Sequence, residues 1–130
     1  MSKPSRGQIV WTVLPDPQGR NPKCRPTVVV TPTAEISSDG DMVVVANTSR
    51  LDMAAPGDQV ELPWHRDGHP RTGLREPSAA VCTWLVRIPS SAIDRYGGQV
   101  PTPQMLRILA RLDALTTTED TPPVNSPEES

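Results

Sequence analysis

The chain has 130 residues, a formal net charge of −2 and 16 prolines. This length predicts one domain with a core large enough to fold alone, and the prolines exclude long uninterrupted helices and a sheet of long central strands. The sequence lacks a run of about 20 apolar residues, the length that a membrane span needs, and its first residues lack the apolar segment of a secretory signal, so we expect a cytoplasmic protein that does not enter membranes.

Three short strands are predicted in the first part of the chain. Residues 8–14, 25–31 and 42–46 are rich in Val and Ile, and such β-branched side chains favour strands. The second of these segments is apolar enough to be buried on both faces of a sheet. Residues 15–24 are rich in proline and polar side chains and are predicted to form a loop. This loop is longer than a tight hairpin needs, and such loops often carry function.

The middle of the chain is predicted to add two strands, a turn and a short helix. Residues 58–62 alternate between polar and apolar side chains, which is typical of a half-buried strand. Residues 79–88 form a longer apolar segment, and Arg66-Asp67-Gly68 between the two is a hairpin-turn signal. We expect a short helix over residues 90–96, ended by the glycine pair that follows.

A helix and a tail are predicted at the C-terminus. Thr102 can cap the helix, and Pro103 suits its first position. Five apolar residues follow at the spacing of one helical face: Met105, Ile108, Leu109, Leu112 and Leu115. Residues 117–130 contain four acids without Lys or Arg, and their Thr, Pro, Glu and Ser content predicts disorder. We therefore assign residues 1–116 to a single domain and residues 117–130 to a disordered tail.

About five short strands followed by one helix predict a mainly β fold, a small and strongly bent β-barrel with a C-terminal α-helix. Without the tail, 13 basic residues face 11 acidic ones, and 11 of the 13 are arginine. Arginine can bind phosphate with two N–H groups at once, so the composition favours a phosphate-bearing partner. A GC-rich genome would enrich arginine in the same way, so the composition alone leaves both explanations open.

His65, Asp67 and His69 lie close together in sequence, across the predicted turn. Two imidazoles and a carboxylate can hold a divalent metal ion, but an ordinary turn explains the same residues and no further ligand lies nearby in sequence. We expect no metal site and no cofactor. His65 could instead serve as a general base, because histidine titrates near neutrality.

Two segments near the N-terminus carry a family pattern. Gly7-Gln8-Ile9-Val10-Trp11 is followed, after the loop, by Arg25-Pro26-Thr27-Val28-Val29-Val30. This pattern resembles the start of the MazF/PemK (Kid-like) toxin family of type II toxin–antitoxin systems, and the resemblance covers roughly residues 6–116. It implies an SH3-like barrel of the CcdB/MazF type and a metal-independent, sequence-specific endoribonuclease that cuts single-stranded RNA. It also implies a cognate antitoxin and a homodimer as partners.

The resemblance further implies that Arg25 and Thr48 form the catalytic pair. In the family the main catalytic residues are the arginine of the Arg-Pro pair and the first hydroxyl residue of a Pro-x-Thr-Thr/Ser segment. Here they correspond to Arg25 and to Thr48 of Ala46-Asn47-Thr48-Ser49. Considered separately, Arg25 could be a strand-edge arginine that pairs with a surface acid, and Thr48 could be a cap at the end of a strand.

RNA can be cut without a metal ion when its 2′-OH attacks the neighbouring phosphate. A base takes the 2′-OH proton, an acid protonates the leaving 5′-oxygen, and a donor stabilises the negative charge that builds on the phosphate. Arg25 suits the third role because its guanidinium stays charged and can grip two phosphate oxygens, whereas it is a poor base. Thr48 could donate a hydrogen bond to the same phosphate.

Four further residues are candidates for RNA binding. Arg20 and Lys23 place positive charge in the first long loop and could follow an RNA backbone, although a solvated loop would have the same composition. Ser49 follows the threonine of the family segment. Trp84 could stack on a base, which is worth about 1–3 kcal/mol, or it could be a buried core residue.

Three features depart from the family pattern. Residues 19–23 contain no acid, whereas family members often carry a glutamate there that is a candidate base. Cys82-Thr83-Trp84 occupies the place of an Asp-Gln pair in the last long strand, and Ala46 replaces a proline. These changes keep open an alternative function: a catalytically inert protein of the CcdB/MazF fold that binds a protein partner, either an antitoxin or a gyrase-like target. An SH3-like interaction module is a third possibility.

Overall fold

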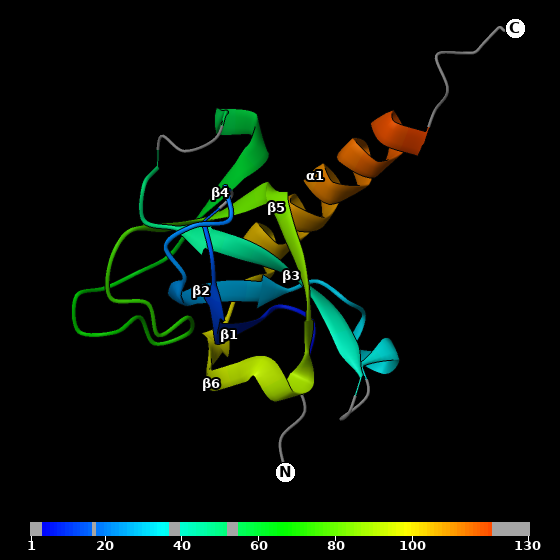
Figure 1. Ribbon diagram of the computed structural model, residues 1–130. Coiled ribbons are helices and arrows are strands. Elements are labelled where there is room, and N and C mark those ends of the chain that lie inside the picture. The colour runs from blue at the N-terminus through cyan, green and yellow to red at the C-terminus, as the bar shows by residue number, and fades with distance from the viewer. Residues whose placement is uncertain (1–3, 17, 37–39, 52–54, 121–130) are drawn as a thin grey trace, which may run out of the picture.

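A computed structural model describes residues 4–16, 18–36, 40–51 and 55–120, without the side chains of residues 56 and 116–120. The elements are β1 (Gln8–Leu14), β2 (Lys23–Val29), β3 (Asp41–Thr48), β4 (Gln59–Leu62), β5 (Ser78–Pro89), β6 (Ile93–Gln99) and α1 (Thr102–Asp120). Short 3₁₀ turns lie at Thr33–Glu35, Pro56–Asp58 and Ser90–Ala92. The fold is therefore mainly β with a C-terminal helix, as the sequence predicts (Figure 1).

The strands form one antiparallel sheet in the order β4-β5-β3-β2-β1-β6. Its register shifts between Val45 and Asn47 of β3, and again along the pairing of β1 with β6, and such irregularities bend strands. The sheet curls strongly, but its edge strands β4 and β6 do not pair with each other within the described residues. The predicted bent barrel is thus present, with its two edges left open.

The central strands are buried on both faces, because successive side chains of a strand point to opposite sides. One core cluster lies under α1 and includes Ile9, Val28, Val45, Met105 and Ile108. The other lies on the opposite face and includes Val10, Val29, Val44 and Ile88. The prediction that the second strand is buried on both faces is confirmed.

The C-terminal helix begins where the sequence predicts and packs on β4 and β5. Arg111 of this helix donates from Nε to Asp58 Oδ1 at 2.8 Å, which ties α1 to the segment before β4. The helix runs to Asp120, past the predicted domain limit at residue 116, and residues 121–130 of the predicted tail lie outside the described residues. Within the described part of the chain, this helix lacks the length of apolar sequence needed to cross a bilayer.

The short helix predicted over residues 90–96 is wrong. Only a 3₁₀ turn forms at its start, and the rest is strand β6. β6 pairs with β1, with Arg95 opposite Trp11 and Tyr96 opposite Val10. Pairing with a strand more than eighty residues earlier outweighs the local preference, because side-chain packing and backbone hydrogen bonds across the sheet favour the extended form.

The glycine pair in β6 brings this strand close to the loop of residues 63–77. A Cβ atom on Gly98 would lie 2.0 Å from the carbonyl oxygen of Arg71, so only glycine fits. Gly98 N donates to Thr72 O at 3.2 Å. The glycine therefore joins β6 to the loop rather than ending a helix.

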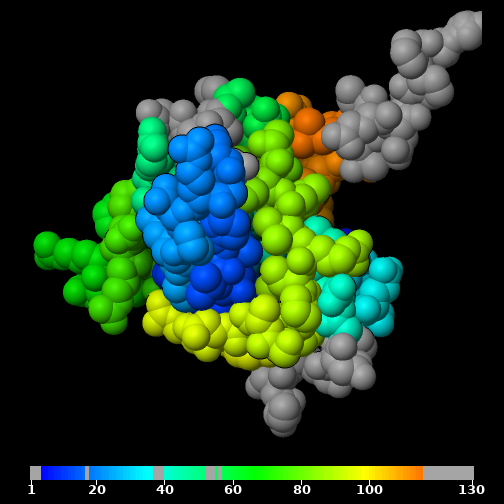
Figure 2. All heavy atoms as spheres, viewed as in Figure 1, coloured from blue at the N-terminus to red at the C-terminus, as the bar shows by residue number. Residues whose placement is uncertain are grey.

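Residues 63–77 form a long loop between β4 and β5 instead of a tight hairpin. The predicted turn at Arg66-Asp67-Gly68 lies inside this loop. Leu74, which is 3% exposed, anchors the loop in the core, and its carbonyl oxygen accepts from His65 N at 3.0 Å and His69 N at 3.1 Å. Figure 2 shows the loop in green beside the blue β1–β2 hairpin, with β6 in yellow below it.

Candidate active site

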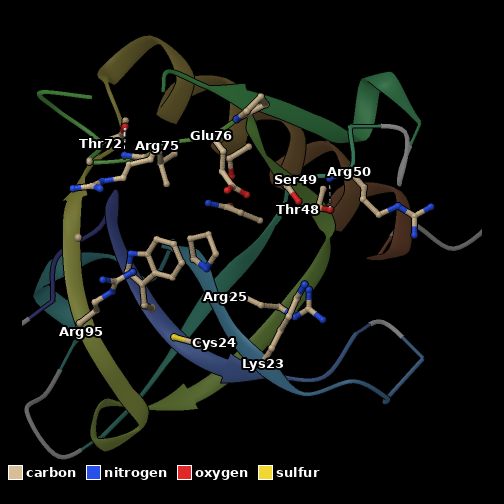
Figure 3. Close-up of a pocket in the computed structure, with 18 of the residues that line it drawn as sticks. Lys23, Cys24, Arg25, Thr48, Ser49, Arg50, Thr72, Arg75, Glu76 and Arg95 are labelled. Carbon is tan, nitrogen blue, oxygen red and sulfur yellow. Dashed lines mark hydrogen bonds between the residues drawn. The ribbon is translucent and has the colours of Figure 1, made fainter. Parts of the chain in front are cut away.

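A groove of about 1000 Å³ lies between β2, the end of β3, the 63–77 loop and β6. Its lining residues include Lys23, Cys24, Arg25, Thr48, Ser49, Arg50, Arg75, Glu76 and Arg95. In Figure 3, Lys23 and Arg25 rise from one wall, and Arg75 and Glu76 come from the wall opposite. The groove thus brings together side chains from four segments that are far apart in sequence.

Arg25 is held in the groove by the backbone around it. It lies on β2 opposite Thr12 of β1 and is half-buried. Its Nε donates to Leu14 O at 3.1 Å and its Nη2 to Asn21 O at 3.2 Å, and its Cζ lies 5.4 Å from the centre of the Trp84 ring. These contacts fix the guanidinium plane and leave other N–H groups to bind an anion.

Thr48 lines the same groove from the end of β3. Its side chain is buried, and its Oγ1 accepts the N–H of Arg50 at 3.0 Å. This bond uses the hydroxyl as an acceptor, so its own hydrogen remains available for donation. The catalytic pair predicted from sequence therefore lies in one cavity.

Five cations line the groove: Lys23, Arg25, Arg50, Arg75 and Arg95. The acids among its described lining residues are Asp16 and Glu76. An excess of positive charge in a concave site attracts polyanions such as a nucleic-acid backbone. Trp11 adds an aromatic surface, and the Cζ of Arg95 lies 4.3 Å from its ring centre.

The sequence matches one protein family over residues 5–116, described as the PemK-like, MazF-like toxin of type II toxin-antitoxin systems. The chain belongs to the PemK/MazF toxin family. The resemblance carried by the Arg-Pro pattern is thereby confirmed. Among curated proteins, none matches this PemK/MazF member in sequence.

Solved structures of PemK/MazF relatives share the fold. MazF from Deinococcus radiodurans is 21% identical, with a TM-score of 0.66 over 89% of this chain and 98% of the other. An endoribonuclease from a mycobacterial species is 20% identical, with a TM-score of 0.64 over 89% and 93%. A mycobacterial endoribonuclease in complex with its cognate antitoxin is 17% identical, with a TM-score of 0.64 over 87% and 94%. These likenesses establish the architecture of the chain.

The four predicted RNA-binding residues are divided between the groove and its surroundings. Lys23 and Ser49 are exposed and line the groove, whereas Arg20 is exposed in the β1–β2 loop beyond it. Trp84 packs against the second core cluster and against Arg25, and it does not line the groove. Trp84 is placed to support the guanidinium of Arg25. Contact of Arg20 and Trp84 with RNA stays a prediction.

Asp16 organises the β1–β2 loop of this PemK/MazF member. Its Oδ1 accepts from Arg20 N at 2.8 Å and Gln18 N at 3.0 Å, and its Oδ2 accepts from Asn21 Nδ2 at 3.1 Å. The Arg20 N–H, followed by the Asn21 and Gln18 donors and the charge of Arg25, lowers the pKa of this carboxyl against the effect of desolvation. Asp16 thus places Asn21, whose carbonyl oxygen holds Arg25.

The two histidines lie outside the groove and serve their own loop. His65 Nδ1 accepts the N–H of Asp67 at 3.1 Å, and His69 Nδ1 accepts the N–H of Arg71 at 3.1 Å. His65, the base considered from sequence, does not line the groove, which leaves that interpretation without support. Among the described residues, no group of three His, Cys, Asp or Glu side chains is placed to hold a metal ion.

Three basic residues of the groove and both of its described acids are not identified from sequence. Arg50 carries a signal, because it follows the family segment directly. Arg75 and Glu76 stand in a loop whose path is set by Leu74, and Arg95 belongs to the strand mistaken for a helix. Only the fold brings these side chains to Arg25.

Proposed function

We propose that this PemK/MazF toxin is a metal-independent endoribonuclease that cuts single-stranded RNA at specific sequences. The observation that carries the proposal is the meeting of Arg25, Thr48 and four further cations in one groove. The mycobacterial relative with the same fold is an endoribonuclease, which supports the same reaction here. The alternative is a catalytically inert protein of the same fold that binds a protein partner, and a cleavage assay distinguishes the two.

In the proposed reaction the 2′-OH of one nucleotide attacks the adjoining phosphate. The products are a 2′,3′-cyclic phosphate and a 5′-hydroxyl. Arg25 stabilises the charge that develops on the phosphate oxygens, since its guanidinium is already oriented by two backbone carbonyls and by Trp84. Thr48 donates its hydroxyl hydrogen to the same phosphate. The other cations hold the flanking phosphates of the strand.

The proposed partners of the protein are RNA, an antitoxin and a second copy of the chain. A mycobacterial relative forms a complex with its cognate antitoxin, and a partner segment with acidic and apolar side chains would suit the basic groove. Val13 and Leu85, which are 59% and 50% exposed, are apolar surface that a homodimer could cover. We place the protein in the bacterial cytoplasm, where messenger RNA is available.

The test is cleavage of a long single-stranded RNA by the purified full chain in EDTA, beside Arg25→Ala and the control Arg87→Ala. Arg87 is exposed on β5 and does not line the groove. We expect discrete cuts that end in cyclic phosphate, about 10²–10³-fold slower cleavage by Arg25→Ala, and no change in Arg87→Ala. Wild-type protein that leaves a wide range of RNAs intact would favour the inert binding protein, and cleavage that EDTA abolishes would contradict metal independence.

A further inference from the structure

The proposed reaction needs a group that takes the proton of the 2′-OH, and the groove offers few of them. Arg25 and the other cations of the groove are too weak as bases. Among the described lining residues, the side chains that can accept a proton include Asp16, Cys24 and Glu76. The surroundings of these three side chains differ, and they decide which one is best suited to act as the base.

Asp16 and Cys24 are poorly suited to the task. Both carboxylate oxygens of Asp16 already accept hydrogen bonds inside the β1–β2 loop, and the lowered pKa of this group makes it a weaker base. Burial, helped by the charge of Asp94, raises the pKa of the Cys24 thiol, so at neutral pH it keeps its own proton. Its Sγ lies 3.7 Å from Asp94 Oδ2.

The Glu76 carboxylate, unlike the side chains of Asp16 and Cys24, has no partner among the described residues. Its side chain is exposed, and it makes no hydrogen bond or ion pair with any other described residue. Figure 3 shows its carboxylate projecting from the upper wall into the groove, facing the wall that carries Arg25 and the end that carries Thr48. A phosphate bound between Arg25 and Thr48 would therefore face the Glu76 carboxylate across the groove.

The fold keeps Glu76 in place although the residue is exposed. Leu74, two positions earlier, is buried in the core and bound by two backbone N–H groups. Ser78, two positions later, is buried and paired with Leu62 at the start of β5. Pro77 restricts the backbone of the residue before it to extended conformations. The backbone of Glu76 is thus held between two anchors, which keeps this residue at the wall of the groove.

We propose that Glu76 is the general base of RNA cleavage, an inference that rests on the proposed function. The Glu76 carboxylate takes the proton of the 2′-OH as the 2′-oxygen bonds to phosphorus. The bond from phosphorus to the 5′-oxygen then breaks, and that oxygen takes a proton from water. Glu76 returns its proton to the resulting hydroxide, so the enzyme ends as it began. The acid missing from residues 19–23 is thus supplied by a different loop.

The test compares single-turnover cleavage by wild type, Glu76→Gln and Glu61→Gln of the full chain, from pH 5 to pH 9. Glu61 is an exposed acid on β4 outside the groove. We expect Glu76→Gln to cut about 10²–10⁴-fold more slowly, while Glu61→Gln matches wild type. Glu76→Asp, which keeps a carboxylate, should retain part of the rate.

Binding is measured with the same RNA carrying a 2′-deoxy nucleotide at the cut site. Removal of a negative charge from a basic groove should leave the affinity of Glu76→Gln equal or higher, so a loss of rate cannot come from weaker binding. Glu76→Gln that cuts at the wild-type rate, while Arg25→Ala does not cut, would overturn the role of Glu76 and leave the proposed function intact. Wild type that cuts no RNA at any pH would overturn both.

Discussion

Asn47 holds a buried amide beside Thr48, the threonine of the proposed catalytic pair. Its side chain is 1% exposed, and neither its Nδ2 nor its Oδ1 has a hydrogen-bond partner among the described residues. A buried polar group without a partner destabilises a fold by about 1–3 kcal/mol. Asn47 lines the groove, yet the two amide atoms themselves have almost no exposed surface, so the unpaired amide is a cost to the stability of the fold.

Asn47→Val should leave the free energy of unfolding unchanged or raise it by about 1 kcal/mol, because valine removes the unpaired amide and favours a strand. The matched variant is Thr12→Val, since Thr12 Oγ1 donates to Ala92 O at 2.8 Å. Loss of that bond should lower stability by about 1–2 kcal/mol. Urea unfolding measures both, and a loss in Asn47→Val as large as in Thr12→Val would show that the amide stabilises the fold.

Single residues of the site could be predicted where sequence neighbours define them. Arg25 and Thr48 stand in recognisable local patterns, and the fold places both on the groove. Glu76 could not be predicted, because nothing in residues 63–77 reveals that Leu74 turns the loop back into the core. A charged residue in a loop acquires a role only through the surfaces that the loop approaches.

Strand β6 controls how the long loop meets the sheet. The bounds of β1 follow from its own β-branched residues, and the structure confirms them. β6 has a weaker local pattern, with two glycines and three polar or charged residues, and its extended form depends on pairing with β1. Elements stabilised by their own sequence could therefore be predicted, and those stabilised by a distant partner could not.

Gly98→Ala should strain the junction between β6 and the 63–77 loop. The added methyl group would meet Arg71 O at 2.0 Å and the carbonyl carbon of Thr72 at 2.7 Å, so backbone has to move. We expect a loss of about 1–3 kcal/mol in stability and slower RNA cleavage, because the loop carries Arg75 and Glu76. Thermal unfolding and the cleavage assay measure the two effects.

Gly57→Ala is the control for this change, since a methyl group there meets no atom within 4 Å. It should alter stability by less than about 0.5 kcal/mol. Equal stability of Gly98→Ala and wild type would mean that the loop and β6 are not held as closely as the structure describes.

The net charge of the whole molecule differs in sign from the charge of the groove. The chain carries a formal net charge of −2, yet five cations and two described acids line the groove. Single-stranded nucleic acid binding weakens with salt by a slope of about 0.7 in log–log terms for each phosphate contact. The fold thus gathers positive charge in the groove, and the overall composition of the chain does not reveal this.

Arg75→Gln should reduce that slope by about 0.7, because it removes one cation that the groove offers to phosphate. Arg107→Gln, at an exposed position of α1 outside the groove, should leave the slope unchanged. The affinity for the 2′-deoxy probe at several salt concentrations gives both slopes. Equal slopes for Arg75→Gln and wild type would place the RNA elsewhere on the surface.

The pairing of β1 with β6 has a consequence for the timing of synthesis. β1 begins at Gln8 and β6 ends at Gln99, so β1 is synthesised more than eighty residues before the strand with which it pairs. The groove lacks Arg95 and the support of the 63–77 loop until these strands meet. A nascent chain therefore carries an unfinished groove until β6 has been synthesised and has paired with β1.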